Sequence, residues 1–336
     1  MVSMKDISRR CNVSVATVSK ALNNRGDISR ETKERICQTA KKMGYLPNSS
    51  ARALKTNRTY NLGVLFVDEA NSGLTHSYFS HVLDSFRLGA EEEGYDITFI
   101  SKHAGKDVLS YYEHSKYRGV DGVVAACVDF DADEVKELIN GNIPVVTIDY
   151  VFDNRSCILS DNVYGMEELV TYIVRQGHRK IAYIHGADSS VTQNRLGSFF
   201  RTMKKFDIEV REEYIREGVY HSPDVSAELT NELLALQDRP TCIIYPDDFS
   251  CIGGINVIEG QGLSIPDDIS VAGYDGQRIA QVIEPKLTTY RQNAEEVGRI
   301  AAKKLVEMIE QPKSALIERV VVRGELVQGK SVLKCK

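Results

Sequence analysis

The sequence predicts an α/β protein with a small helical head followed by two doubly wound parallel-sheet subdomains. Three observations lead to this fold class. Short, well-capped helical patterns fill the first 46 residues. From residue 61, continuous apolar runs of strand length alternate with longer amphipathic runs, which is typical of parallel sheets covered on both faces. This alternation passes through two cycles in series, and two such units form a cleft near the carboxyl ends of their strands.

The composition indicates a globular cytoplasmic protein. Of 336 residues, 42% are hydrophobic and 26% are charged. No apolar run approaches the roughly 20 residues that span a bilayer, and the start lacks the basic-then-apolar pattern of a signal peptide. The seven cysteines form no CxxC pair, which argues against both a zinc site and a disulfide framework.

Charge is distributed unevenly along the chain. Residues 1–60 contain 13 Lys and Arg against 4 Asp and Glu, whereas the remaining residues contain 29 against 43. A basic segment attached to an acidic body is the electrostatic pattern of a nucleic-acid-binding module joined to a body with another task.

The basic segment contains a helix–turn–helix pattern. A first helix is expected over Met4–Cys11, and Asn12 suits a tight turn because Asn tolerates left-handed backbone. Ser14 is a candidate N-cap for a second helix that reaches Asn23. A third helix, capped by Ser29, is expected over 31–43 and ends at Gly44. The second helix presents mostly short, uncharged side chains, which suits entry into a major groove. A three-helix bundle that binds no nucleic acid is the alternative.

The head resembles the DNA-binding domain of the lac repressor (LacI/GalR) family. The resemblance rests on four segments in order: Lys5-Asp6-Ile7-Ser8, residues 13–23, Ser29-Arg30-Glu31-Thr32, and Gly44-Tyr45-Leu46-Pro47-Asn48. Asn12 departs from the usual Gly of the family. The resemblance implies a DNA-binding domain over 1–46, a hinge helix or linker over 47–59, and an effector-binding and dimerisation domain over 60–336.

The candidate DNA contacts fall into three groups. Val15, Ala16 and Lys20 are the candidate base-reading residues, and of these only the Lys20 side chain can hydrogen-bond a base edge. Four polar residues of the second helix are candidate phosphate contacts: Ser14, Thr17, Ser19 and Asn23. The resemblance implies hinge contacts in the minor groove, with Leu54 as an apolar wedge. The other hinge residues are Asn48, Ala51, Arg52 and Lys55.

The body, which resembles a periplasmic sugar-binding protein, is expected to fold as two subdomains. The N-subdomain spans about 60–158 plus 288–320, and the C-subdomain spans about 159–287 plus 321–336. One return crossing is expected at Leu287-Thr288-Thr289. Strands are expected at 61–67, 96–101, 120–126, 144–148, 180–185, 213–217, 241–245, 269–272 and near 317–323. Helices are expected at 78–93, 108–115, 132–140, 164–176, 195–206, 224–236, 249–261 and 294–309.

The candidate effector site lies just past strand ends. Asp149, Asp247 and Asp275 follow strands and can accept hydrogen bonds from vicinal hydroxyls. Each is alternatively a helix cap or a loop carboxylate, and Asp248 is a candidate cap of the helix that follows it. The resemblance adds His76, Tyr78, Phe79, Arg195 and Tyr220, and Phe249 is a candidate aromatic contact. Asp247 replaces the family's more usual Asn, and Ser198 replaces a Gly near Arg195. This set favours a neutral sugar or polyol, with a weakly anionic sugar as the second choice.

The function expected is a sequence-specific transcriptional repressor of carbohydrate-utilisation genes, released from a pseudo-palindromic operator by a sugar-like inducer. The resemblance implies that it acts as a homodimer. An enzyme is disfavoured because no GxxxxGK[ST] occurs and no GxGxxG opens a helix after a strand. No catalytic set, metal site or cofactor is predicted. A corepressor-dependent regulator, with a nucleobase or phosphoprotein partner, and a sugar-binding transport protein are the alternatives.

Overall fold

A computed structural model of the chain describes residues 2–23, 28–46, 58–67 and 73–335. The chain forms two compact units, Met1–Thr59 and Tyr60–Lys336. Among the described residues, no helix combines the length and the apolar character needed to cross a membrane.

The first unit contains three short helices around a small core. They are α1 (Met4–Cys11), α2 (Val15–Leu22) and α3 (Arg30–Lys42). The caps confirm the sequence prediction, because the side chains of Ser14 and Ser29 accept hydrogen bonds from backbone N–H groups of their own first turns. Asn12 adopts φ 51° between α1 and α2, as expected for the turn. The buried apolar side chains come from all three helices: Ile7, Cys11, Val18, Ala21, Ile36 and Ala40.

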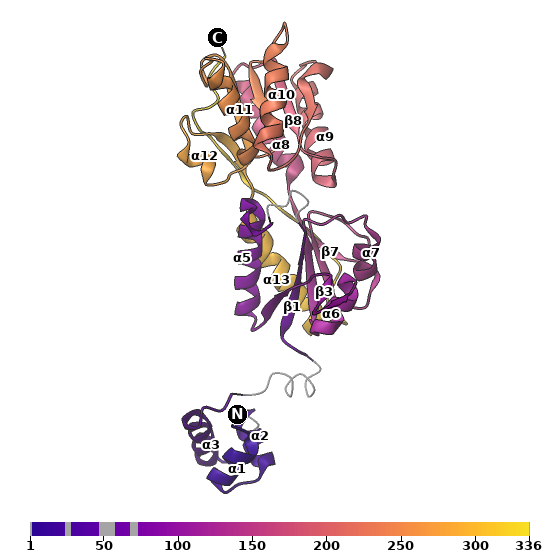
Figure 1. Cartoon of the computed structure of the whole chain (residues 1–336), viewed down its shortest axis with the longest axis vertical. Helices are drawn as coiled ribbons and strands as arrows, with labels where there is room; N and C mark the ends of the chain where they lie inside the picture. Colours follow the sequence, from indigo (N-terminus) through magenta and orange to yellow (C-terminus); the bar gives the residue numbers. More distant parts are fainter. Residues whose placement is uncertain (1, 24–27, 47–57, 68–72, 336) are drawn as a thin grey trace. The chain divides into compact units, whose positions relative to one another are not determined.

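The second unit contains two six-stranded sheets, one in each subdomain (Figure 1). The N-subdomain sheet is wholly parallel, in the order β13-β7-β6-β5-β1-β2. Its strands are β1 (Asn61–Phe66), β2 (Asp96–Phe99), β5 (Gly122–Ala126), β6 (Val145–Ile148), β7 (Ser156–Ser160) and β13 (Arg319–Val322). Its helices are η1 (Gly73–Thr75), α5 (Ser77–Glu92), α6 (Tyr111–Arg118), α7 (Asp133–Asn140) and α13 (Ala294–Glu310).

The C-subdomain sheet has the order β14-β12-β11-β10-β8-β9; of the pairings between its described strands, that of β12 with β14 is antiparallel and the others are parallel. Its strands are β8 (Ile181–His185), β9 (Ile215–Glu217), β10 (Cys242–Ile244), β11 (Ser270–Asp275), β12 (Thr288–Arg291) and β14 (Glu325–Val327). Its helices are α8 (Asn162–Arg175), α9 (Ser190–Lys205), η2 (Glu212–Tyr214), α10 (Pro223–Ala235), α11 (Asp248–Gly260) and α12 (Ile279–Val282).

Each sheet is covered on both faces by a separate apolar cluster. Leu62 and Phe86 belong to the cluster on one face of the N-subdomain sheet, and Leu65 and Leu138 to the cluster on the other. The C-subdomain is built in the same way. Two separately packed subdomains behave as rigid bodies, so relative motion is concentrated where the chain passes between them.

The chain passes between the subdomains three times: at Asp161, at Gln292-Asn293 and at Arg323-Gly324. The structure therefore corrects the predicted subdomain limits. The segment Thr288–Arg291 is β12 of the C-subdomain rather than a return crossing, because this mostly buried strand pairs in parallel with β11. The first crossing follows Ser160 rather than residue 158, and β13 keeps the chain in the N-subdomain to Val322.

One local prediction was also wrong. The segment expected to form a helix from residue 108 begins with a small hairpin, β3 (His103–Ala104) with β4 (Asp107–Val108). The helix starts at Tyr111, where Ser110 and Glu113 form a capping box. This cap supplies acceptors to the first N–H groups of α6, so it sets the start of the helix.

Gly298 allows α13 to pack closely on α5, because a Cβ at this position would overlap the Val82 carbonyl oxygen. We expect Gly298→Ala to lower the free energy of unfolding by about 1–3 kcal/mol. Gly197 in α9 has open space where a Cβ would lie, so Gly197→Ala should raise it by about 0.5–1 kcal/mol. Urea unfolding of both variants tests this pair, and equal stability of the two would contradict it.

Candidate functional site

The candidate DNA-recognition surface of the head is on α2. Ser14 Oγ accepts a hydrogen bond from the Thr17 N–H at 3.0 Å and lies 2.8 Å from Thr17 Oγ1. Val15 and Ala16 are exposed, whereas Val18 and Ala21 are buried in the core. The helix therefore turns its two small apolar residues outward at its N-terminal end, where base-reading side chains of a recognition helix lie.

The other predicted DNA contacts lie either on α2 or in the hinge segment. Asn23 ends α2, and its amide Nδ2 donates to the Ser19 carbonyl oxygen at 2.6 Å, which holds both residues at one end of the helix. Lys20 belongs to the last turn of α2. The predicted hinge contacts lie outside the described residues: Asn48, Ala51, Arg52, Leu54 and Lys55.

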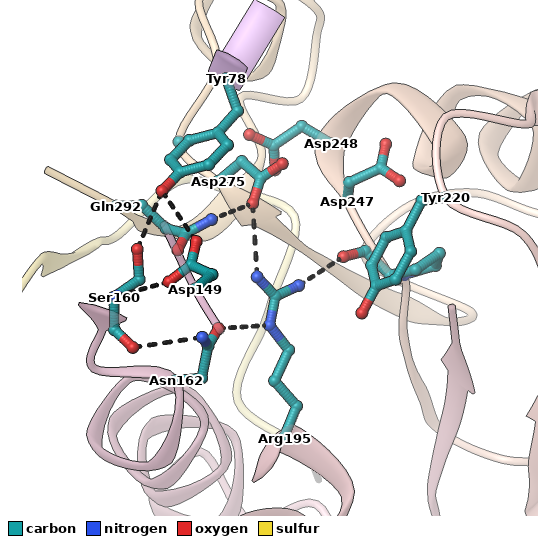
Figure 2. Close-up of polar contacts among 12 residues, drawn as sticks. Tyr78, Asp149, Ser160, Asn162, Arg195, Tyr220, Asp247, Asp248, Asp275 and Gln292 are labelled. Carbon is teal, nitrogen blue, oxygen red and sulfur yellow. Dashed lines mark hydrogen bonds and ion pairs between the residues drawn. The ribbon is translucent and has the colours of Figure 1, made fainter. Parts of the chain in front are cut away.

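Asp149 lies in the second unit, at the carboxyl end of β6. Its Oδ1 accepts the Ser160 N–H at 2.7 Å, and its Oδ2 lies 3.4 Å from the Tyr78 hydroxyl (Figure 2). The Tyr78 hydroxyl is also 2.9 Å from Ser160 Oγ. Burial raises the pKa of Asp149, although the Ser160 N–H and Arg195 oppose that shift. Asp149 is thus a half-buried acceptor held in place by neighbours from α5 and β7.

Arg195 and Asp275 form the buried charged pair of the cleft (Figure 2). Arg195 Nη2 lies 3.7 Å from Asp275 Oδ1, and Arg195 Nη1 donates to the Pro246 carbonyl oxygen at 3.1 Å. The guanidinium carbon lies 3.7 Å from the centre of the Tyr274 ring, which adds a cation–π contact. Burial raises the pKa of Asp275, and the charge of Arg195 opposes that shift. Because 3.7 Å is longer than a hydrogen bond, the guanidinium and the carboxylate both keep hydrogen-bonding capacity for a ligand placed beside them.

Asp247 has a different position from the one expected. It is the N-cap of α11, where its two carboxylate oxygens accept the backbone N–H groups of Ser250 and His221, each at 2.8 Å. Burial alone would raise the pKa of Asp247, but the hydrogen bonds from His221 and Ser250 outweigh burial and lower it. The predicted cap, Asp248, is instead buried, and its Oδ2 accepts the Gln277 N–H at 2.6 Å. Asp247 therefore takes the helix-cap role that was the alternative for it, and Asp248 is a buried acceptor for the loop after β11.

Aromatic rings line the opening between the subdomains. His76, at the start of α5, stacks on His221 of the C-subdomain with ring centres 4.0 Å apart. Phe79 packs against His76, and Phe249 packs against His221, each at 5.0 Å. The Tyr220 hydroxyl lies 2.9 Å from Thr192 Oγ1. The structure thus brings His76, Phe79 and Phe249 into one row.

Sequence reasoning missed four residues of this cleft: Ser160, Asn162, His221 and Gln292. Ser160 ends β7, and Asn162 and Gln292 each follow a strand by one or two residues. The rule that found Asp149, a polar residue just past a strand, also applies to these residues, but β7 and β12 had not been recognised as strands. His221 carries no comparable signal, since it lies in the loop before α10.

Three cleft residues adopt left-handed backbone: Asp149 at φ 59°, His221 at φ 59° and Asp275 at φ 92°. This conformation is uncommon for residues other than Gly, and it clusters at sites where side chains must be aimed in a particular direction. Here it aims two carboxylates and one imidazole into the space between the subdomains.

A cavity of about 240 Å³ adjoins the Asp149 side of this cleft. Its lining is polar at Asp149, Ser160, Asn162 and Asn194, and apolar at Val151 and Val191. A larger groove of about 570 Å³ lies at Arg211, Glu212, Glu213 and Arg216. That groove is open and its Arg211 and Arg216 side chains already form ion pairs, whereas the smaller cavity is more enclosed and is lined by Asp149 and Asn162 of the cleft.

The titration of Asp248 leads to a testable prediction. Burial raises the pKa of Asp248 well above its usual value of 3.8. The folded state therefore keeps a proton that the unfolded chain releases, so stability is full below the unfolded pKa and is lost as the pH rises through the folded pKa. Asp248→Asn retains an oxygen for the Gln277 N–H and cannot ionise. We expect its melting temperature, relative to wild type, to increase between pH 4 and pH 8.

The control for this measurement is Asp153→Asn, whose side chain is fully exposed. Its melting temperature should follow that of the wild type across the same pH range. Parallel curves for Asp248→Asn and the wild type would show that this carboxyl does not titrate as its burial requires.

Comparison with known proteins identifies the family of this chain. Residues 3–48 match the family described as bacterial regulatory proteins, lacI family, and residues 170–332 match the periplasmic binding protein-like domain. The chain is 31% identical to the probable HTH-type transcriptional repressor ExuR of Bacillus subtilis, covering 99% of this chain and 98% of that protein. It is 30% identical to the HTH-type transcriptional repressor PurR of Mannheimia succiniciproducens, covering 99% of each.

Two solved structures share the fold. The lac repressor dimer bound to operator and the anti-inducer ONPF superposes with a TM-score of 0.84 at 23% identity, over 99% of both chains. The complex of the transcriptional regulator CelR with cellobiose gives a TM-score of 0.72 at 22% identity, covering 98% of this chain and 100% of that one. Together with the full-length matches to repressors, these findings establish that the chain belongs to the lacI family of bacterial regulatory proteins and is a DNA-binding transcriptional repressor.

Proposed function

We propose that this repressor controls carbohydrate-utilisation genes and that its effector is a neutral sugar or polyol bound between the subdomains. The observation that carries the proposal is the arrangement of Asp149 and Asp275 around Arg195 in the cleft. Their carboxylates accept hydrogen bonds from hydroxyl groups, and the guanidinium donates to hydroxyl oxygens. Two of the structurally similar regulators are described with cellobiose and with bound ribose.

The balance of charge supports a neutral effector. Among the described residues that meet at this point of the cleft, two carboxylates, Asp149 and Asp275, face the one guanidinium of Arg195. An anionic effector would add a further negative charge close to both carboxylates, and like charges in a low-dielectric site repel strongly. Asp247 is excluded from the proposed contacts because its own helix cap occupies both of its oxygens.

The proposed contacts combine both subdomains. The N-subdomain supplies His76, Tyr78, Phe79 and Asp149, and the C-subdomain supplies Arg195, Tyr220, Phe249 and Asp275. A ligand held by both groups favours one angle between the subdomains over another, and it shifts the population toward that angle by its difference in affinity. We propose that the favoured angle releases the operator, so that the effector is an inducer acting in the cytoplasm.

We propose that a homodimer places two heads on two half-sites of a pseudo-palindromic operator, because a two-fold protein matches a two-fold site. In this proposal the outward residues of α2 read bases and its polar residues hold phosphates. The fold of the lac repressor dimer on its operator, which this chain shares, supports the arrangement.

A thermal-shift screen of the full-length protein tests the effector class. The panel contains D-ribose, cellobiose and xylitol, with D-galacturonate, D-glucuronate and hypoxanthine as the competing chemistries. A binder present at 100 times its dissociation constant stabilises the folded state by about 2.7 kcal/mol. A response restricted to the uronates or to hypoxanthine would overturn the neutral-sugar assignment.

The sign of the response is tested on DNA. A duplex selected from random sequence by the wild-type protein serves as the operator, and its affinity is measured with and without the compound found in the screen. Weaker binding in the presence of that compound is expected for induction. Tighter binding would establish corepression instead.

Asp149→Asn tests the proposed sugar contact. The variant keeps the size of the side chain but loses the charged acceptor, so the affinity for the sugar found in the screen should fall roughly 10- to 100-fold. Calorimetric titration measures the change. Asp153→Asn removes an exposed carboxylate and should bind that sugar as the wild type does, whereas equal loss in both variants would remove Asp149 from the site.

Lys20→Ala tests base reading by α2. Loss of a side chain that hydrogen-bonds a base costs about 1–3 kcal/mol for the preferred base and relaxes selection at that position. Lys41→Ala removes the same charge from the last turn of α3 and should leave the selected sequence unchanged. Sequence selection from random DNA with each variant measures both outcomes, and an unchanged preference in Lys20→Ala would contradict the assignment.

A further inference from the structure

Two buried amides lie at crossings between the subdomains. Asn162 is the first residue of α8 and directly follows the crossing at Asp161. Gln292 lies in the second crossing, between β12 and α13. Their side chains are 5% and 7% exposed, so their polar groups depend on partners within the protein.

Each amide is bound to one member of the charged pair in the cleft (Figure 2). Arg195 Nε donates to Asn162 Oδ1 at 2.8 Å, and Gln292 Nε2 donates to Asp275 Oδ1 at 2.7 Å. Asn162 also reaches the N-subdomain, because its Nδ2 donates to the carbonyl oxygen of Ser160 at 3.2 Å. Asn162 and Gln292 therefore connect the Arg195–Asp275 pair to two of the crossings by hydrogen bonds.

The crossings are also joined to one another. Arg323 Nε lies 3.3 Å from Asp161 Oδ2, and the Asp161 N–H donates to the Val322 carbonyl oxygen at 2.9 Å. The Gly324 N–H donates to the Tyr290 hydroxyl at 2.9 Å. The first and third crossings are thus in direct contact, and Gly324 of the third is bonded to β12, two residues before the second crossing.

We propose that Asn162 and Gln292 are positioning residues through which the Arg195–Asp275 pair sets the angle between the subdomains and thereby the affinity for operator DNA. The inference rests on the proposed function, in which Arg195 and Asp275 contact the effector. When a ligand draws either charged group toward itself, the bonded amide must follow or leave a buried polar group unpaired, which is unfavourable. Because each amide lies at a crossing, its movement changes the conformation of the chain between the two subdomains.

A double-mutant cycle tests the proposal without an effector, because a substitution in the pair replaces the ligand as the perturbation. The variants are Asp275→Asn, Gln292→Met and the double variant, and the measured quantity is the affinity of the full chain for the duplex selected by the wild type. We expect Asp275→Asn alone to change this affinity at least about 5-fold, the lower end of typical allosteric couplings. In the Gln292→Met background the same substitution should change it less than about 2-fold.

Gln277→Met is the matched control. The Gln277 amide is also buried, and its Nε2 lies 3.5 Å from Asp275 Oδ2, but the residue belongs to the loop between β11 and α12 within the C-subdomain. Asp275→Asn should keep its full effect on DNA affinity in this background. A purely structural role for Gln292 would lower the melting temperature of its variants and leave the operator affinity of the folded protein unchanged.

A second cycle, with Arg195→Lys and Asn162→Leu, examines the other amide and serves if Asp275→Asn does not fold. Arg195→Lys retains the positive charge but removes the Nε–H group that donates to Asn162 Oδ1. Additive effects in the cycles that fold, or no effect of the charged-pair variants on DNA affinity, would overturn the inference. Failure of the proposed function has a different signature, since the wild type would then select no duplex or respond to no compound in the screen.

Discussion

The buried guanidinium of Arg195 is the charge around which the cleft is arranged. A cation removed from water requires acceptors on several sides, because an unpaired buried charge strongly destabilises the folded state. The protein supplies Asn162, the Pro246 carbonyl oxygen, the Asp275 carboxylate and the face of Tyr274. These groups come from the start of α8, the loop after β10 and the end of β11. Satisfying one side chain therefore brings together the segments that form the proposed effector site.

The fold makes such a site responsive as well as specific. Each sheet has its own apolar clusters on both faces, so the two subdomains keep their internal packing while the crossings between them change. Asp149 and Asp275, which stand at the carboxyl ends of strands in different subdomains, adopt left-handed backbone that directs them into the shared space. The proposed ligand contacts, the strand ends and the crossings thus occupy the same small region, where a bound molecule would have most influence on the angle between the subdomains.

The particular residues show where sequence reasoning succeeds and where it fails. Ser14, Ser29 and Asn12 were placed correctly because a cap or a left-handed turn depends on the few residues around it. Tyr78, Asp149, Arg195 and Asp275 were expected at the cleft, and the structure brings them into one network. Helix α11 is capped by Asp247 rather than by Asp248, since adjacent carboxylates after a strand differ only in the direction in which the backbone turns them. Gln292 was missed because β12 was not recognised as a strand, and His221 because its partner Asp247 lies 26 residues away.

The sequence by itself determined the α/β class, the three-helix head with its capping residues, and the basic character of that head. These features follow from local periodicity, short-range hydrogen bonds and composition, which are all readable along the chain. Only the tertiary structure decided that Thr288–Arg291 pairs with β11 in the C-subdomain and that Asp247 caps a helix. It alone also decided that Asn162 and Gln292 join the Arg195–Asp275 pair to the crossings. Those outcomes depend on which distant segments meet and on which buried polar groups must satisfy one another, and no window of sequence contains both partners.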